Sequence, residues 1–72
     1  MIERLKMETK DVIVKLRNQS NMTKEELAEK VYVTRQAVSR WETGETTPNI
    51  EALKQLSAIF NVSINSLMTK SI

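Results

Sequence analysis

The stretch that decides the fold is residues 23–44, TKEELAEKVYVTRQAVSRWETG. It holds two short helix-forming runs separated by residues 32–34. Thr23 and Glu26 have the Thr-x-x-Glu spacing of a capping box, which predicts that the first of these helices begins after Thr23. Because a connection of three residues is too short for a long antiparallel overlap, the two helices must cross steeply. The segment therefore predicts a helix-turn-helix.

The rest of the chain also favours helices. Gly44 and Pro48, the only Gly and the only Pro, mark one strong loop signal. Cap residues and apolar positions at helical spacing on either side predict an all-α fold of five helices. Their expected ranges are 9–19, 24–31, 35–43, 50–60 and 64–68. With 72 residues, the chain is expected to be one domain, over residues 9–70.

Residues 1–8 precede this pattern as an N-terminal extension. Ile2, Leu5 and Met7 could lengthen the first helix, form a dimer contact or belong to a frayed end. The frayed end is the default interpretation, because chain termini are poorly ordered unless tertiary contacts hold them.

The second helix of the motif has two contrasting faces. At about 100° per residue, Val38 and Trp41 share one face, which predicts core packing for Trp41 and not stacking on a nucleobase. The opposite face carries Arg35, Gln36, Ser39 and Arg40. Arg pairs two donors with guanine and Gln pairs with adenine, so this face is suited to a DNA major groove.

Several runs of the sequence resemble one family at its usual spacing. They are LR at 16–17, MTKEELAEKV at 22–31, VTRQAVSRWETG at 33–44, PNI at 48–50 and LSAIFNVS at 56–63. Over residues 13–68 the chain resembles the phage-repressor family of helix-turn-helix proteins, also called the Cro/CI or xenobiotic-response-element family. The resemblance implies a compact five-helix repressor-like domain that binds operator DNA, usually as a two-fold dimer.

The resemblance also implies roles for individual residues. The matching positions read bases at Arg35, Gln36 and Arg40, and sometimes at Ser39. Arg17 and Glu42 match two residues that form an ion pair, which joins the first helix to the end of the third. The expected contacts with DNA phosphates are Thr23, Lys24, Thr34, Thr46, Thr47 and Asn49.

Three residues depart from the family pattern. Lys24 replaces a Gln that contacts phosphate and braces the recognition helix, so it keeps only the phosphate role. Tyr32 stands where the turn usually has Gly, and a positive φ there would cost about 1 kcal/mol or more. Ser57 replaces a small apolar residue and is expected to bond back to a helix carbonyl.

Composition narrows the classes of function. There is no Cys and no His, which argues against a zinc site, a thiol enzyme and imidazole catalysis. One Gly cannot make a phosphate-cradling loop, so we expect no enzyme activity, cofactor or metal. No apolar run approaches the roughly 18–20 residues that span a bilayer. We expect a cytoplasmic protein with no small-molecule effector bound by this chain.

Two functions from different classes remain. The favoured one is a DNA-binding transcriptional regulator, more specifically a repressor. The alternative is a protein-interaction module on the same fold, such as an antitoxin-like or anti-repressor subunit. An apolar patch on the third helix would have favoured the alternative, whereas the polar face with two Arg residues favours DNA.

A regulator of this kind is expected to pair weakly and to be held as a dimer by DNA. One recognition helix reads too few base pairs to find one site among roughly a million competitors. In the family, the pairing surface lies near the last helix. Ile64 and Leu67 are expected in the core, with Asn61 and Asn65 at the rim, which leaves Met68 and Ile72 as anchors.

Overall fold

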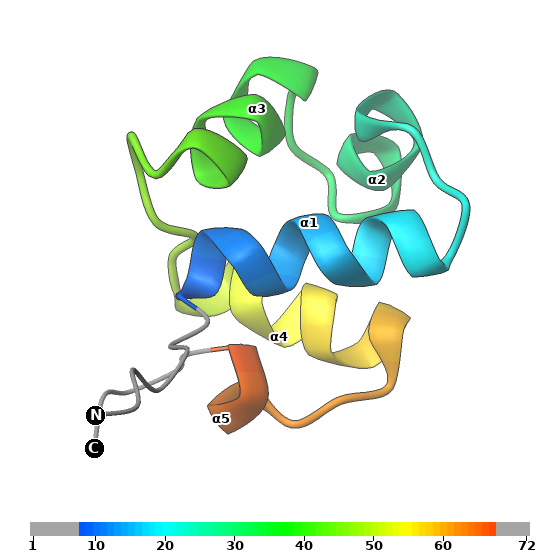
Figure 1. Ribbon diagram of the computed structural model, residues 1–72, viewed down its shortest axis with the longest axis vertical. Helices are drawn as coiled ribbons and strands as arrows, with labels where there is room; N and C mark the ends of the chain where they lie inside the picture. The colour runs from blue at the N-terminus through cyan, green and yellow to red at the C-terminus, as the bar shows by residue number, and fades with distance from the viewer. Residues whose placement is uncertain (1–7, 68–72) are drawn as a thin grey trace, which may run out of the picture.

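Every regular element in the part of the chain that can be described is a helix. The computed structural model describes residues 8–67, and Figure 1 shows their arrangement. The helices are α1 (Thr9–Gln19), α2 (Lys24–Lys30), α3 (Arg35–Thr43), α4 (Ile50–Phe60) and α5 (Ile64–Leu67). The predicted ranges of the first four helices are confirmed to within a residue.

The predicted fifth helix needs a correction. Within residues 8–67, four helices have seven residues or more, whereas α5 has only four. Residues 8–67 therefore form four full helices followed by a single helical turn that ends at the last described residue. A segment this short closes almost no i→i−4 hydrogen bonds of its own. It is held instead by packing, because the Leu67 side chain is completely buried.

Side-chain caps begin the helices at the positions that the sequence indicates. The hydroxyl of Thr23 accepts from the backbone N–H of Glu26, and the Glu26 carboxylate accepts from the N–H of Thr23. The Asn49 side chain accepts from the Ala52 N–H at 2.8 Å. Gly44, with φ 86°, ends α3 in the left-handed conformation. These caps join residues only three apart, so the helix starts can be recognised from the sequence without the tertiary packing.

The core takes one fully buried side chain from each helix. These are Ile13, Leu27, Val38, Leu56 and Leu67. Trp41 is 6% exposed, which confirms that it is a core residue. Full burial of one such side chain contributes about 1.5–3 kcal/mol, so each helix is tied to the same cluster.

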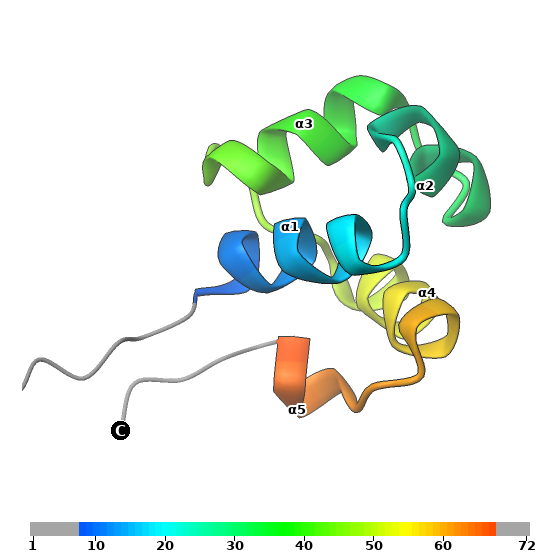
Figure 2. The same cartoon turned by 45° about the vertical axis from the view of Figure 1, so that its right-hand side comes forward.

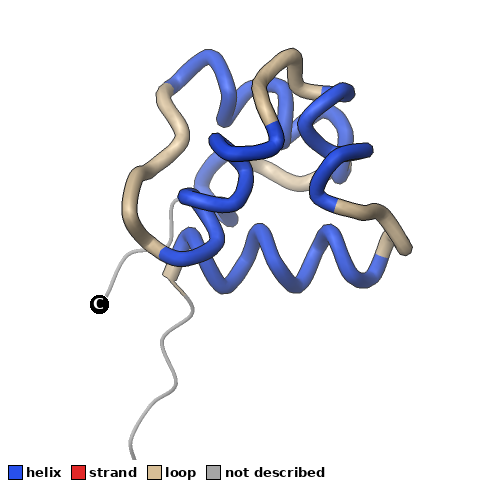
Figure 3. Tube along the Cα trace, turned by 90° about the horizontal axis from the view of Figure 1, so that it is seen from above, coloured by secondary structure: helices blue, strands red, loops and turns tan. Residues whose placement is uncertain are grey.

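The helices form two groups on either side of α1. Figures 1 and 2 both show α2 and α3 on one side of α1, with α4 and α5 on the other. In both views α3 lies next to α1, and α2 is set at a steep angle to α3. Seen from above, the connections are short loops between closely packed helices (Figure 3). This arrangement leaves one side of α3 facing outward.

The turn between α2 and α3 is made without glycine. Tyr32 has φ 59°, which is a left-handed conformation. The next N–H, that of Val33, donates to the Ala28 carbonyl at 3.0 Å and closes the turn. The tight connection that the sequence predicts is therefore present, with Tyr32 in the strained conformation.

The hydrogen bond of Ser57 differs from the one expected from the sequence. Its hydroxyl donates to the carbonyl of Val62, which lies beyond the end of α4. It does not bond back to a carbonyl within the helix. The bond fastens the loop that leaves α4, where Asn61 is left-handed with φ 56°.

None of the helices described is long and apolar enough to cross a membrane.

Candidate nucleic-acid interface

The outer face of α3 carries the predicted reading side chains. Arg35, Gln36 and Arg40 are exposed, whereas Ser39 is half-buried. The buried Val38 and Trp41 hold the opposite face against the core. With the apolar face buried, the polar face of the same helix points outward. The structure thus brings these four polar residues together on one helix surface.

Two threonine caps keep a donor available beside this face. Thr34 precedes α3, and its hydroxyl accepts from the Ala37 N–H at 3.1 Å. Thr23 does the same at the start of α2. A hydroxyl that accepts one hydrogen bond still has its own hydrogen to donate. Both caps can therefore donate to a phosphate oxygen without releasing the helix.

The remaining predicted phosphate contacts lie at other helix starts and in one loop. Lys24 is the half-buried first residue of α2, and within residues 8–67 no hydrogen bond joins it to α3. Thr46 and Thr47 are exposed in the α3–α4 loop. The amide nitrogen of Asn49 has two donors left while its oxygen caps α4.

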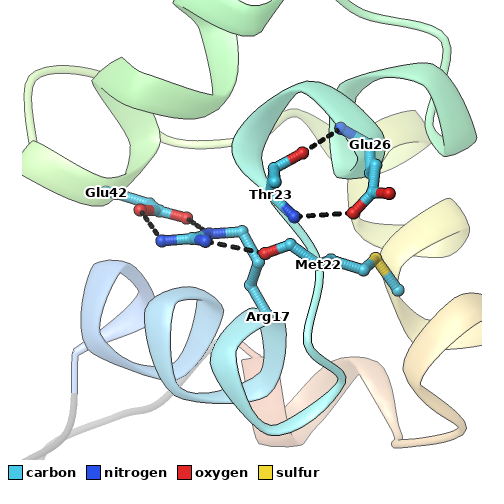
Figure 4. Close-up of polar contacts among 5 residues, drawn as sticks. All are labelled: Arg17, Met22, Thr23, Glu26 and Glu42. Carbon is cyan, nitrogen blue, oxygen red and sulfur yellow. Dashed lines mark hydrogen bonds and ion pairs between the residues drawn. The ribbon is translucent and has the colours of Figure 1, made fainter.

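An ion pair braces α3 from behind. Arg17 of α1 donates to the Glu42 carboxylate of α3 through Nε at 2.7 Å and through Nη2 at 3.1 Å. Its Nη1 also donates to the Met22 carbonyl at 2.8 Å, just before α2 (Figure 4). The side chains are 14% and 6% exposed. One guanidinium thus connects α1, α3 and the entry to α2, as Figure 4 shows.

Two contacts at this site were missed by reasoning from sequence. One is the Met22 carbonyl, which shares Arg17 with Glu42. The other is an exposed pair between Arg40 Nε and Glu45 Oε1, 3.8 Å apart. Helical spacing gives no signal for the second pair, because the chain leaves the helix at Gly44 between the two residues. The only available hint was an acidic residue next to a loop expected to meet phosphates.

Fold and site together define a helix-turn-helix domain with a braced and polar second helix. The chain belongs to the helix-turn-helix family, whose model matches residues 13–67. It is 44% identical over 63 residues to the HTH-type transcriptional activator BcrR of Enterococcus faecalis. That match covers 88% of this chain but only 31% of the relative, so the chain spans about a third of that protein.

Two solved structures with bound DNA are similar to this chain. The P22 c2 repressor in complex with a synthetic operator has a TM-score of 0.83 and 30% identity, covering 89% of this chain and 97% of the repressor chain. SinR of Bacillus subtilis in complex with DNA has a TM-score of 0.75 and 32% identity. That match covers 82% of this chain and 95% of SinR's.

Proposed function

We propose that this chain is the sequence-specific DNA-binding domain of a transcriptional regulator. In this proposal α3 enters the major groove of double-stranded DNA. The observation that carries it is the outward face of α3, where Arg35, Gln36 and Arg40 are exposed directly opposite the buried Val38 and Trp41. The similar P22 and SinR structures, both solved with DNA, support the same reading.

The reading side chains differ in what they can recognise. Arg35 and Arg40 each present a fork of donors that fits guanine O6 and N7. The Gln36 amide has one donor and one acceptor edge, which fits adenine N6 and N7. Ser39 is shorter and half-buried, so its role is limited to a base or backbone group that approaches closely. Together these residues define a short half-site.

Phosphate contacts on both sides of α3 set its position in the groove. Such contacts fix register and orientation but carry no sequence information. We assign them to exposed or half-buried donors at helix starts and in the loop after α3, namely Thr23, Lys24, Thr34, Thr46, Thr47 and Asn49. Lys24 is the one full charge among them, so it contributes most to the salt dependence of binding.

The regulator acts on a near-palindromic operator as a dimer that DNA stabilises. The proposed anchors Met68 and Ile72 lie outside the described residues, whereas Leu67 is fully buried and Ile64 is half-buried. Occupancy of an operator that overlaps a promoter is sufficient for repression, because a bound protein blocks other proteins from the same DNA. We therefore propose repression as the outcome for this domain.

Selection of bound sites from a random duplex pool tests the proposal. We expect an enriched, near-palindromic sequence containing guanine and adenine at adjacent positions of each half-site. Arg35→Ala should then flatten the preference at one base pair, with a loss of roughly 1–3 kcal/mol of discrimination. Failure to bind any duplex at low salt would contradict the proposal and favour a protein-interaction module.

Lys24→Ala is the matched control for a contact with no sequence preference. It should weaken binding to every duplex alike and lower the slope of log K against log salt by about one. A change in the preferred sequence on this substitution would show that the base-reading and phosphate-contacting roles are wrongly divided.

A further inference from the structure

An acidic side chain stands beside one of the two reading arginines. Glu45 Oε1 lies 3.8 Å from Arg40 Nε, and the side chains are 59% exposed for Arg40 and 68% for Glu45. Glu45 is also placed between α3 and the loop residues Thr46 and Thr47. Arg40, Thr46 and Thr47 are all proposed above to contact DNA. A carboxylate in this position repels phosphates and so lowers the affinity for DNA. Any contribution of Glu45 to DNA recognition must therefore be something other than affinity.

The backbone holds Glu45 in this place. Gly44 turns the chain with φ 86°, and the next two N–H groups both donate to the Arg40 carbonyl. The distances are 2.9 Å for Glu45 and 3.3 Å for Thr46. Because the Glu45 backbone is tied to the Arg40 carbonyl, the Glu45 side chain starts within reach of the Arg40 guanidinium. The loop geometry therefore favours the contact between the two side chains.

The contact leaves the reading edge of Arg40 accessible. The closest approach of the carboxylate is to Nε, on the stem side of the guanidinium. A guanidinium has five N–H donors in a fixed fork, and its terminal nitrogens can still pair with a guanine. Glu45 thus offsets the charge of Arg40 without covering the donors that read a base.

We propose that Glu45 is a specificity-determining residue that limits non-specific DNA binding through Arg40. The inference rests on the proposed function. On random DNA an unpaired Arg40 would neutralise a phosphate, and non-specific binding consists mainly of such contacts. On the operator Arg40 donates short hydrogen bonds to a neutral base, which depend on geometry more than on net charge. Glu45 therefore weakens non-specific complexes more than the specific one.

Glu45→Gln tests this with a readout that folding alone does not move. Affinity for a random duplex should rise about threefold to tenfold, and its salt slope should steepen by about one, as for one more neutralised phosphate. Affinity for the selected operator should rise less, so that the ratio of specific to non-specific affinity falls. Glu29→Gln is the matched control, because it makes the same charge change at an exposed site near the C-terminal end of α2.

A second variant shows whether Glu45 acts through Arg40. In an Arg40→Ala background, Glu45→Gln should change both affinities by the same factor and leave their ratio unaltered. An equal rise on both duplexes in the wild-type background would overturn the proposal, because it would mean simple repulsion of phosphates. A loss of operator binding with random binding unchanged would also overturn it, since Glu45 would then read a base itself.

These outcomes are separate from failure of the proposed function. If the unmodified chain enriches no sequence from a random pool, the DNA-reading role fails. If it enriches an operator but Glu45→Gln leaves the affinity ratio as it was, only the role of Glu45 fails.

Discussion

Arg17 concentrates several contacts in one side chain. It pairs with Glu42 through two nitrogens and also donates to the Met22 carbonyl. Both charged groups are largely removed from water, and such a pair is favourable only when its hydrogen bonds are satisfied. Here the carboxylate has a bidentate partner and the third nitrogen has a carbonyl. The brace is therefore expected to be sensitive to loss of either charge.

A double-mutant cycle measures this brace. We expect Glu42→Gln and Arg17→Met each to lower the free energy of unfolding by about 2–4 kcal/mol, since each leaves a buried partner without its counterion. The double variant should lose less than the sum, with a coupling energy above about 1 kcal/mol. Urea unfolding followed by circular dichroism gives all four values.

The exposed pair of Arg40 and Glu45 is the matched control for that cycle. It joins the same two residue types at 59% and 68% exposure, and exposed pairs contribute about 0–1 kcal/mol. Equal coupling energies in the two cycles would show that burial of the Arg17–Glu42 pair has no effect on its strength.

Tyr32 has a strained backbone conformation, and its exposed side chain adds no burial in the core to offset that strain. Its φ is 59° and it is 82% exposed. A left-handed residue with a Cβ costs about 1–2 kcal/mol. A Gly at this position avoids that cost, but part of the gain is lost because Gly gives the unfolded chain more conformational freedom. Tyr32→Gly should therefore stabilise the domain by about 0.5–1 kcal/mol, seen as a higher urea midpoint.

Asn21→Gly serves as the comparison for that substitution. Asn21 has nearly the same φ, 57°, but Asn tolerates this region better than Tyr. Its midpoint should hardly move. A lower midpoint for Tyr32→Gly would mean that contacts of the Tyr32 ring along the adjoining groove, which also includes Asn49 and Gln55, outweigh the strain.

The pair α2 and α3 works as a unit because the two helices approach closely. Ala28 on α2 is 3% exposed, and its carbonyl accepts the N–H of Val33 that closes the turn. A small side chain here permits the steep crossing that turns the polar face of α3 outward. The position of the reading face is thus set by packing behind it.

Ala28→Leu should disturb both stability and DNA binding. Forcing a larger side chain into a packed interface costs about 1–3 kcal/mol, and any relief requires α3 to shift away from α2. We expect a lower unfolding midpoint together with weaker operator binding under conditions where the variant is folded. Ala58→Leu on the exposed side of α4 should change either quantity little, within about 0.5 kcal/mol.

For the molecule as a whole, the proposed assembly is two copies on one near-palindromic operator. Two recognition helices of a two-fold dimer reach half-sites one helical turn apart, roughly 34–36 Å. The two proposed anchors, Met68 and Ile72, lie outside the described residues, and two side chains are far fewer than a stable dimer interface needs. We therefore propose that DNA supplies most of the energy that holds the two copies together.

Sedimentation with and without a palindromic duplex checks this assembly. We expect monomers at micromolar concentration in the absence of DNA, and two copies per duplex at saturation. A duplex in which the half-sites are offset by half a helical turn should bind the two copies without cooperativity. A single copy per palindromic duplex, with an asymmetric footprint, would contradict dimeric binding.

Local features of the fold were predictable because their causes are local. Thr23, Thr34 and Asn49 cap helices through bonds that span three residues, so their spacing is visible in the chain. Val38 and Trp41 follow from helical periodicity. The Arg17–Glu42 pair spans 25 residues, and only the family resemblance indicated it. The Arg40–Glu45 contact was missed because it depends on the path of the loop after Gly44.

The amino-acid sequence by itself determined the boundaries of four helices, the apolar face of each and the set of polar side chains on α3. These depend on bonds and spacings within about four residues, which any folded form of the chain would share. Only the tertiary structure decided that α5 is a single turn within residues 8–67, that Met22 shares Arg17 with Glu42, and that Glu45 lies against Arg40. Those features arise where separate segments compete for the same space and the same hydrogen-bond partners, and that competition is resolved only when the whole chain packs.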